Sequence, residues 1–104
     1  MRVNDSDSRQ RISIGDKGYY QIGSDSYPIT CISVSPKKAK IGIRFESFSP
    51  GDKHDYYGVQ QWIILPNING RIDFAYWSTI SNTYRLESGH CYFGHWRAYK
   101  DPSF

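Results

Sequence analysis

The chain has 104 residues, of which 38% are hydrophobic and 22% charged, and its formal net charge is +3 at pH 7. This length fits one domain. So mild a charge excludes the strongly basic surface of a dedicated duplex-DNA-binding protein. No apolar run approaches the ~20 residues of a membrane span, and no basic segment followed by an apolar one resembles an export signal. Aromatic residues make up 16% of the chain, and because a domain of this size buries only about 60–70% of the surface that its unfolded chain exposes, we expect several rings to lie on a surface that binds something.

Turn-forming residues divide the chain into short segments. Residues 1–10 are polar, and we expect a flexible N-terminal tail there, followed by a single domain over residues 11–104. Clusters of Gly, Pro, Ser, Asp and Asn then recur about every eight to twelve residues, which is typical of a small sandwich or barrel. The sequence therefore predicts an all-β fold, a small and strongly bent antiparallel β-barrel of SH3-like or OB-like size with about five to seven strands.

Three segments in the first two thirds of the chain have the pattern of strands. In residues 27–35 the apolar face changes sides half-way, which predicts a β-bulge. Residues 41–46 alternate apolar and polar side chains, which places Arg44 and Glu46 on the outer face. Residues 59–65 carry apolar side chains on both faces.

A further strand is predicted at residues 72–77, with Asp73 on the outer face. Asn69 and Gly70 precede it and form the strongest hairpin signal in the chain, so we expect this strand to pair with residues 59–65. A sheet built from so few residues has edges that need covering. Homo-oligomerisation is a simple way to cover them, and we expect it.

The reactive side chains do not have the spacing of a catalytic or metal site. His90 and Cys91 are neighbours, so in a strand they point to opposite faces, and His95 is too far along to reach the thiol directly. The histidines and cysteines match no metal-binding motif. Without an export signal, Cys31 and Cys91 are expected as reduced thiols in the cytoplasm. The sequence thus predicts a protein that is not an enzyme and has no metal and no cofactor.

Residues 92–99 combine rings with cations. As a strand, this segment would place His95, Arg97 and Tyr99 on one face and Trp96 on the other. Rings beside a guanidinium are what base stacking and phosphate binding require. The alternative is that these rings build the core and a dimer interface, and the pattern leaves both interpretations open.

Residues 55–62 form a second candidate segment. Tyr56 and Tyr57 offer rings for stacking, and the amides of Gln60 and Gln61 have the groups that can read a base edge. An outward arginine could join either segment. The candidate ligand-binding residues are therefore Arg44, Tyr56, Tyr57, Gln60, Gln61, His95, Trp96, Arg97 and Tyr99.

Two short motifs carry a resemblance to a known family. Residues 23–30 (GSDSYPIT) are similar to the opening hairpin, GSDSYP-x-T, of a family of small uncharacterised bacteriophage proteins, and residues 99–104 (YKDPSF) resemble the Y-x-DPSF C-terminus of that family. The YGVQ sequence at residues 57–60 resembles a third element of the family. This resemblance implies a phage accessory protein in the host cytoplasm.

Together these observations suggest a non-catalytic counter-defence protein. It would bind and sequester a small phosphate-bearing ligand, expected to be a nucleotide immune signal, at the interface of a homo-oligomer. Arg44 and Arg97 would hold phosphates, while an aromatic side chain would stack on the base. Two alternatives remain: a β-barrel that binds single-stranded nucleic acid, and a protein-interaction module that inhibits a host defence protein.

Overall fold

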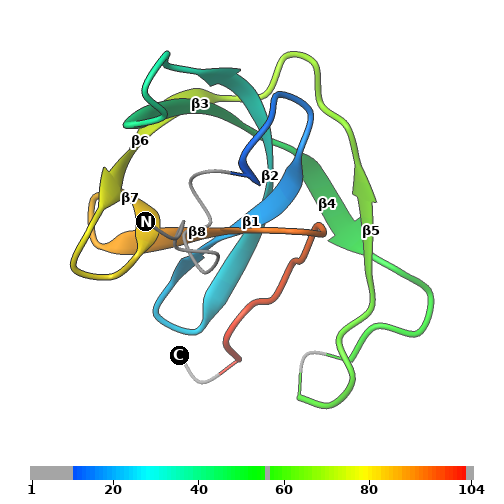
Figure 1. The fold of residues 1–104 in the computed structure, drawn as a ribbon. Coiled ribbons are helices and arrows are strands. Elements are labelled where there is room, and N and C mark those ends of the chain that lie inside the picture. The colour runs from blue at the N-terminus through cyan, green and yellow to red at the C-terminus, as the bar shows by residue number, and fades with distance from the viewer. Residues whose placement is uncertain (1–10, 56, 103–104) are drawn as a thin grey trace.

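The structure is a computed structural model that describes residues 11–55 and 57–102, and these residues form an all-β fold (Figure 1). The strands within them are β1 (Lys17–Ile22), β2 (Asp25–Val34), β3 (Lys40–Phe45), β4 (Ser47–Pro50), β5 (Trp62–Leu65), β6 (Ile72–Ser78), β7 (Thr83–Leu86) and β8 (Gly89–Phe93). The predicted fold class is confirmed. The expected tail, residues 1–10, lies outside the described residues.

Six of these strands close into one barrel. Their order is β1-β2-β3-β6-β7-β8, every pairing is antiparallel, and β1 closes the barrel by pairing with β8. β4 and β5 pair with each other and form a separate two-stranded sheet. We call residues 47–65, which comprise this sheet and its connecting loop, the arm. The arm projects from the right-hand side of the barrel in Figure 1.

The barrel interior is filled by branched apolar side chains from adjacent strands. Ile29 and Cys31 of β2 face Ile41 and Ile43 of β3, and all four are buried. The alternation predicted for residues 41–46 is therefore correct for its apolar members. Burying each isoleucine contributes about 1.5–3 kcal/mol to folding.

Two of the nine tyrosines belong to this interior. Tyr20 and Tyr84 are buried, and their hydroxyl groups donate hydrogen bonds to the carbonyl oxygens of Leu86 and Lys38, each over 2.8 Å. Because each buried hydroxyl has an acceptor, these rings are accommodated without the cost of an unpaired polar group.

The faces of β6 are opposite to the prediction. In an antiparallel pair, directly opposed residues share a face, and the register sets Ala75 opposite the buried Ile41. Ala75 is accordingly buried, whereas Ile72 and Phe74 point outward, and Asp73 does not lie on the outer face as predicted. Ala75 belongs to the same buried cluster as Tyr84, Ile41 and Ile43.

The predicted β-bulge is present, since the β2–β3 register shifts between Cys31 and Ser33. The predicted hairpin at Asn69–Gly70 is wrong. A turn does form there, with the Gly70 amide donating to the Asn67 carbonyl oxygen over 2.8 Å. However, β5 pairs with β4, and β6 pairs with β3 and β7. Gly70 is needed for close approach, because a Cβ at this position would collide with the carbonyl oxygen of Phe45.

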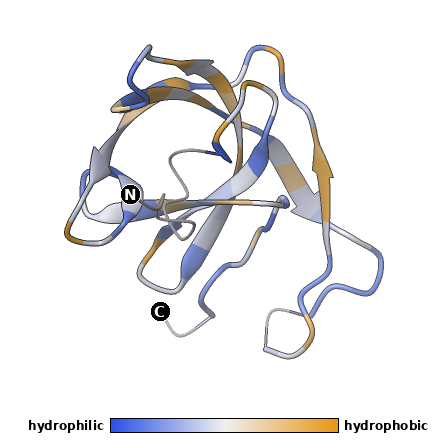
Figure 2. Cartoon of the chain, viewed as in Figure 1, coloured by the Kyte–Doolittle hydropathy of each residue, from blue (hydrophilic) through white to orange (hydrophobic). Residues whose placement is uncertain are grey.

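Aromatic rings attach the arm to the barrel. The ring of Phe48 packs edge-on against Trp62, with centroids 5.1 Å apart, and lies 6.0 Å from the ring of Tyr27 on β2. A two-stranded hairpin is marginally stable by itself, so this contact contributes to holding the arm in place. Figure 2 shows that the hydrophobic stretch of β5 nevertheless lies at the outer edge of the molecule.

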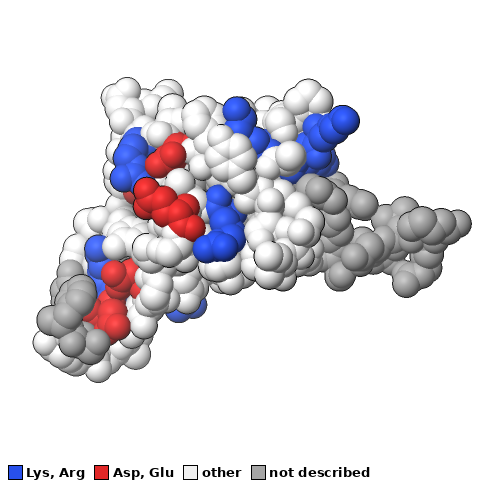
Figure 3. Space-filling view, turned by 90° about the vertical axis from the view of Figure 1, so that its left-hand side faces the viewer, with Lys and Arg blue, Asp and Glu red and all other residues white. Residues whose placement is uncertain are grey.

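The side of the barrel formed by β6 and β7 carries lysine and arginine side chains around an uncharged surface, with acidic side chains gathered toward one edge (Figure 3). Among residues 11–55 and 57–102 there is no helix long and apolar enough to cross a membrane.

Candidate ligand-binding surface

The residues after β8 leave the sheet. Gly94 has a φ of 140°, a conformation that favours glycine, and β8 ends just before it, at Phe93. The strand predicted over residues 92–99 is therefore wrong beyond Phe93. Residues 94–102, which we call the strap, instead cross the outside of β2, where Ser26 and Tyr99 exchange backbone hydrogen bonds of 2.9 and 3.0 Å.

The strap completes a group of rings on the outer surface. Tyr19 of β1 and Tyr92 of β8 are cross-strand neighbours with ring centroids 5.4 Å apart, and the His95 ring lies 5.7 Å from Tyr19. The Arg97 guanidinium lies 5.8 Å from the centre of Tyr19 and 5.9 Å from that of Tyr99. We call these five residues the aromatic strip. His95, Arg97 and Tyr99, which the sequence predicted on one face, are thus brought together by the strap rather than by a strand.

The strip is accessible and carries positive charge. Tyr92 is 40% exposed, and His95 and Arg97 are exposed as well. The Nε of Arg97 donates a hydrogen bond to the Ser26 hydroxyl over 3.3 Å, which orients the guanidinium. Among the described residues, no acidic side chain forms an ion pair with it. Its charge therefore remains available to an anion.

A cavity adjoins the strip at one end of the barrel. Its volume is about 560 Å³, and its lining includes Tyr92 and Phe93 of β8, two basic side chains, Lys17 and Arg11, and one acidic side chain, Asp16. Cavities of roughly 300–1,000 Å³ are those in which proteins bind small molecules. The combination of rings and basic side chains suits a planar, anionic ligand.

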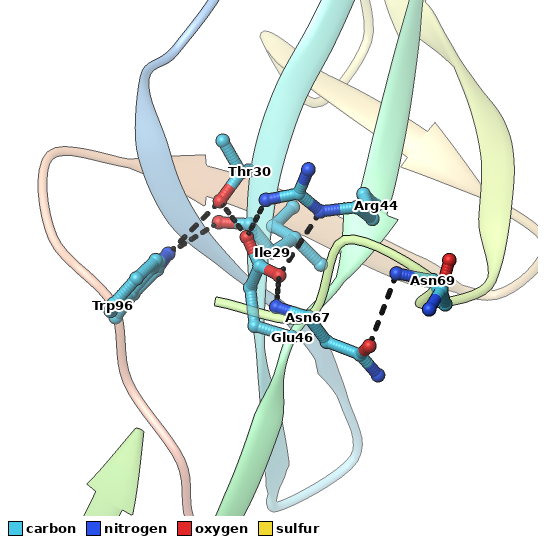
Figure 4. A network of polar contacts seen from close by, with 7 residues as sticks. All are labelled: Ile29, Thr30, Arg44, Glu46, Asn67, Asn69 and Trp96. Carbon is cyan, nitrogen blue, oxygen red and sulfur yellow. Dashed lines mark hydrogen bonds and ion pairs between the residues drawn. The ribbon is translucent and has the colours of Figure 1, made fainter. Parts of the chain in front are cut away.

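Trp96 belongs to the structural side of the strap. Its indole Nε1 donates to the carbonyl oxygen of Ile29 over 3.0 Å and to the Thr30 hydroxyl over 3.2 Å (Figure 4). The ammonium of Lys17 lies 4.4 Å from the centre of its ring. This tryptophan was predicted to stack on a ligand, but its contacts show that it anchors the strap to β2.

Arg44 has an internal partner too. Its Nη2 lies 2.8 Å from Oε2 of Glu46 and its Nε donates to Oε1 over 3.1 Å. Glu46 also accepts hydrogen bonds from the Thr30 hydroxyl and from the backbone amide of Asn67 (Figure 4). Glu46 is buried, so its predicted outward position is wrong: β3 ends at Phe45, and the chain there turns the carboxylate toward these donors.

The protonation of this pair follows from its surroundings. Burial raises the pKa of Glu46, but the hydrogen bonds from Arg44, Thr30 and the Asn67 amide outweigh it, so the net pKa lies below the ordinary value. The hydrogen bond to Glu46 raises the pKa of Arg44 in turn. Both groups stay ionised and neutralise each other, which makes Arg44 a poor candidate for holding a phosphate.

The second predicted segment, residues 55–62, lies apart from the aromatic strip: Asp55 and residues 57–61 belong to the arm loop, and Trp62 begins β5. Tyr56 lies outside the described residues, and Tyr57 is 85% exposed in that loop. Gln60 holds the backbone of Lys100 in the strap, donating to its carbonyl oxygen over 2.6 Å and accepting from its amide over 3.0 Å. Gln61 accepts from the Lys53 amide over 2.8 Å.

The two cysteines are free and buried. Burial raises the pKa of Cys31 to about 11 and that of Cys91 to about 12, so neither forms a thiolate readily near neutral pH. His90 interacts with the Thr83 hydroxyl over 2.8 Å. Within the part of the chain that the structure describes, no group of three or more His, Cys, Asp or Glu residues could hold a metal ion.

Sequence reasoning did not identify Tyr19, Tyr92 and Lys17 as members of this surface. The sequence does contain one indication, because Lys17 and Tyr19 occupy outward positions in a segment of alternating side chains. It does not reveal which strand pairs with that segment. Only the pairing of β1 with β8 brings Tyr19 beside Tyr92. Comparisons with protein-family models, with curated proteins and with solved structures found no match to this chain.

Proposed function

We propose that this protein is a non-catalytic binder of a small phosphate-bearing ligand, specifically a nucleotide, at the aromatic strip. The observation that carries the proposal is the position of the Arg97 guanidinium between the rings of Tyr19 and Tyr99, beside the exposed Tyr92. A base stacks on such rings, and a guanidinium without an acidic partner binds phosphate oxygens through two parallel hydrogen bonds.

The adjoining cavity supports a small ligand. It shares Tyr92 with the strip and adds the basic side chains of Lys17 and Arg11. A second copy of the chain over the open side of the strip would enclose the ligand further. The resemblance of the motifs implies a phage accessory protein, and the use that we propose for this surface in such a protein is the sequestration of a host nucleotide signal.

The cysteine environments support a binding role rather than nucleophilic catalysis. A catalytic thiol needs a lowered pKa and access to solvent. Cys91 has the reverse, with a buried side chain and a pKa raised to about 12.

Native mass spectrometry and thermal shift against a panel of cyclic and linear nucleotides test the proposal. We expect a retained nucleotide and a higher Tm, because a ligand that binds only the folded state stabilises it. Tyr92→Leu and Arg97→Gln should each weaken binding roughly 5- to 150-fold, the range for the loss of one stacked ring or one charged contact. Arg71→Gln is the matched control, since Arg71 is exposed but lies 3.6 Å from Asp73. No binding by any nucleotide would refute the proposal.

One observation favours a second candidate, a binder of single-stranded nucleic acid. Tyr92, Tyr19 and His95 follow one another at 5.4 and 5.7 Å, so the strip offers faces for successive bases. The affinity of such a protein for an oligonucleotide falls steeply with salt, because each phosphate contact releases counterions. Titrations of a mononucleotide and of a short oligonucleotide at two salt concentrations distinguish the candidates.

A further inference from the structure

The outer face of β6 is an apolar surface that no other described residue of the chain covers. Ile72, Phe74 and Tyr76 point outward in a row and are 54%, 45% and 57% exposed. Opposite Phe74 on β3 stands Gly42, so no neighbouring side chain on that strand shields the ring. We call these three side chains the β6 face. Exposed apolar rows of this kind are typical of contact surfaces.

The arm presents a second apolar surface. Ile63 and Leu65 of β5 are 49% and 59% exposed, and the register places the small side chains of Ser49 and Ser47 beside them. Val59, 80% exposed, lies in the chain segment leading into β5. We call the four strand residues on this side, Ser47, Ser49, Ile63 and Leu65, the arm face. The opposite side of the arm sheet carries Phe48 and Trp62, which are used to attach the arm to the barrel.

The two surfaces do not meet within one molecule. Figure 1 places β6 on the left-hand side of the barrel and β5 on the right-hand side. Figure 2 shows that the hydrophobic stretch of β5 lies at the outer edge of the molecule, apart from the barrel. Within the part of the chain that the structure describes, neither surface covers the other, so each is open to a partner from another molecule.

Charge distinguishes the two surfaces and makes them complementary. The β6 face lies between two cations: Lys40, whose ammonium is 5.0 Å from the centre of Phe74, and Arg85, which is paired with Tyr76 across the strands. The arm carries Asp52 and Asp55 in its loop against one lysine, Lys53, so the net charge of the loop is negative. Two β6 faces packed on each other would bring like charges together, which is unfavourable. An arm packed on a β6 face brings opposite charges together.

We propose that the arm face of one copy of this chain docks on the β6 face of a second copy. The contact is head-to-tail, so each copy offers one arm and one β6 face, and further copies add until a ring closes or an open filament forms. This inference is independent of the nucleotide surface, because it uses no residue of the aromatic strip.

Sedimentation or size-exclusion chromatography with light scattering tests the contact with two double variants. Ile63→Thr/Leu65→Thr alters the arm face, and Phe74→Thr/Tyr76→Thr alters the β6 face; threonine suits exposed strand positions. We expect the wild-type chain to associate and each double variant to run as a monomer with an unchanged circular dichroism spectrum. Ile80→Thr is the control, since Ile80 is 99% exposed and belongs to neither surface.

Mixing the two double variants is the decisive measurement. The arm-face variant keeps an intact β6 face and the β6-face variant keeps an intact arm, so the mixture should form a dimer with one chain of each and grow no further. A monomeric wild-type chain at all concentrations, or a mixture that stays monomeric, would overturn the inference. So would an arm-face variant that still dimerises, because that result means that β6 faces pair with each other.

Discussion

The two sides of the strap differ in how their polar and aromatic groups are used. On its inner side, Trp96 donates to the backbone of β2, and Lys100 is held through its backbone by Gln60. On its outer side, His95 and Arg97 lie exposed beside the ring of Tyr19. The sequence offers equally suitable ligand-binding residues on both sides, but those with internal partners are committed to the fold. An exposed ring beside a cation such as Arg97, which forms no ion pair with any acidic side chain among the described residues, is the better indicator of a candidate site.

Among the substitutions that test this difference between the two sides of the strap, the largest loss of unfolding free energy is expected at Glu46. Glu46→Gln leaves the guanidinium of Arg44 without its counter-charge, and breaking such a buried pair costs about 3 kcal/mol. The matched control is Asp73→Asn, which removes the exposed ion pair with Arg71 and should cost less than about 1 kcal/mol. Urea unfolding at neutral pH measures both. Equal losses of unfolding free energy in the two variants would contradict the prediction that the buried pair contributes more to stability than the exposed one.

The same carboxylate predicts a dependence on acid. The pKa of folded Glu46 lies below its ordinary value of 4.5, so the unfolded chain takes up a proton first as the pH falls. Its stabilising contribution is therefore present above this value and is lost as the pH falls through the folded pKa. We expect a smaller loss of unfolding free energy on acidification in Glu46→Gln than in the wild type. Parallel acid titrations followed by fluorescence check this, and identical curves would contradict it.

A smaller effect is expected where the arm meets the strap. Gln60→Ala removes two hydrogen bonds to the backbone of Lys100, each worth about 1 kcal/mol, so a loss of about 2 kcal/mol is expected. Hydrogen exchange should report faster opening of the strap in this variant. Gln61→Ala serves for comparison, because it removes one hydrogen bond within the arm loop and should leave exchange in the strap unchanged.

The smallest differences in unfolding free energy are expected for two neighbouring residues on opposite sides of the strap, Trp96 and His95. Trp96→Phe loses the indole hydrogen bonds and should cost about 1 kcal/mol, whereas His95→Gln, at an exposed position, should change the unfolding free energy by less than about 0.5 kcal/mol. Nucleotide affinity is expected to show the opposite order. If Trp96→Phe weakens binding more than His95→Gln, the assignment of the two sides is wrong.

Local patterns in the sequence predicted much of the fold. Regular turn residues and the alternation around Ile41 and Ile43 indicated a small antiparallel barrel, and a change of phase near Cys31 indicated the bulge. What they could not give is which strands pair. The turn at Asn69–Gly70 has the chemistry of a hairpin, but it leads from the arm into the barrel because β5 finds its partner in β4.

The candidate surface was predictable only in part, for the same reason. Alternation placed His95, Arg97 and Tyr99 on one side, and they do gather, although Gly94 ends the strand before them. Tyr19 joins them through the pairing of β1 with β8, which no local pattern reveals. The role of Trp96 depends on acceptors in β2, far away in sequence.

The pairing of β1 with β8 also has a consequence for how the chain folds. Because Tyr20 pairs with Cys91, the barrel cannot close until almost the whole described chain is available. Contacts between residues so distant in sequence slow folding, and all-β domains of this kind fold in about milliseconds to seconds. During synthesis on the ribosome, β1 and β7 would have open edges until β8 emerges, and such edges are prone to aggregate. The synthesis of β8 is therefore the step after which the edges of β1 and β7 are covered and the risk of misassembly falls.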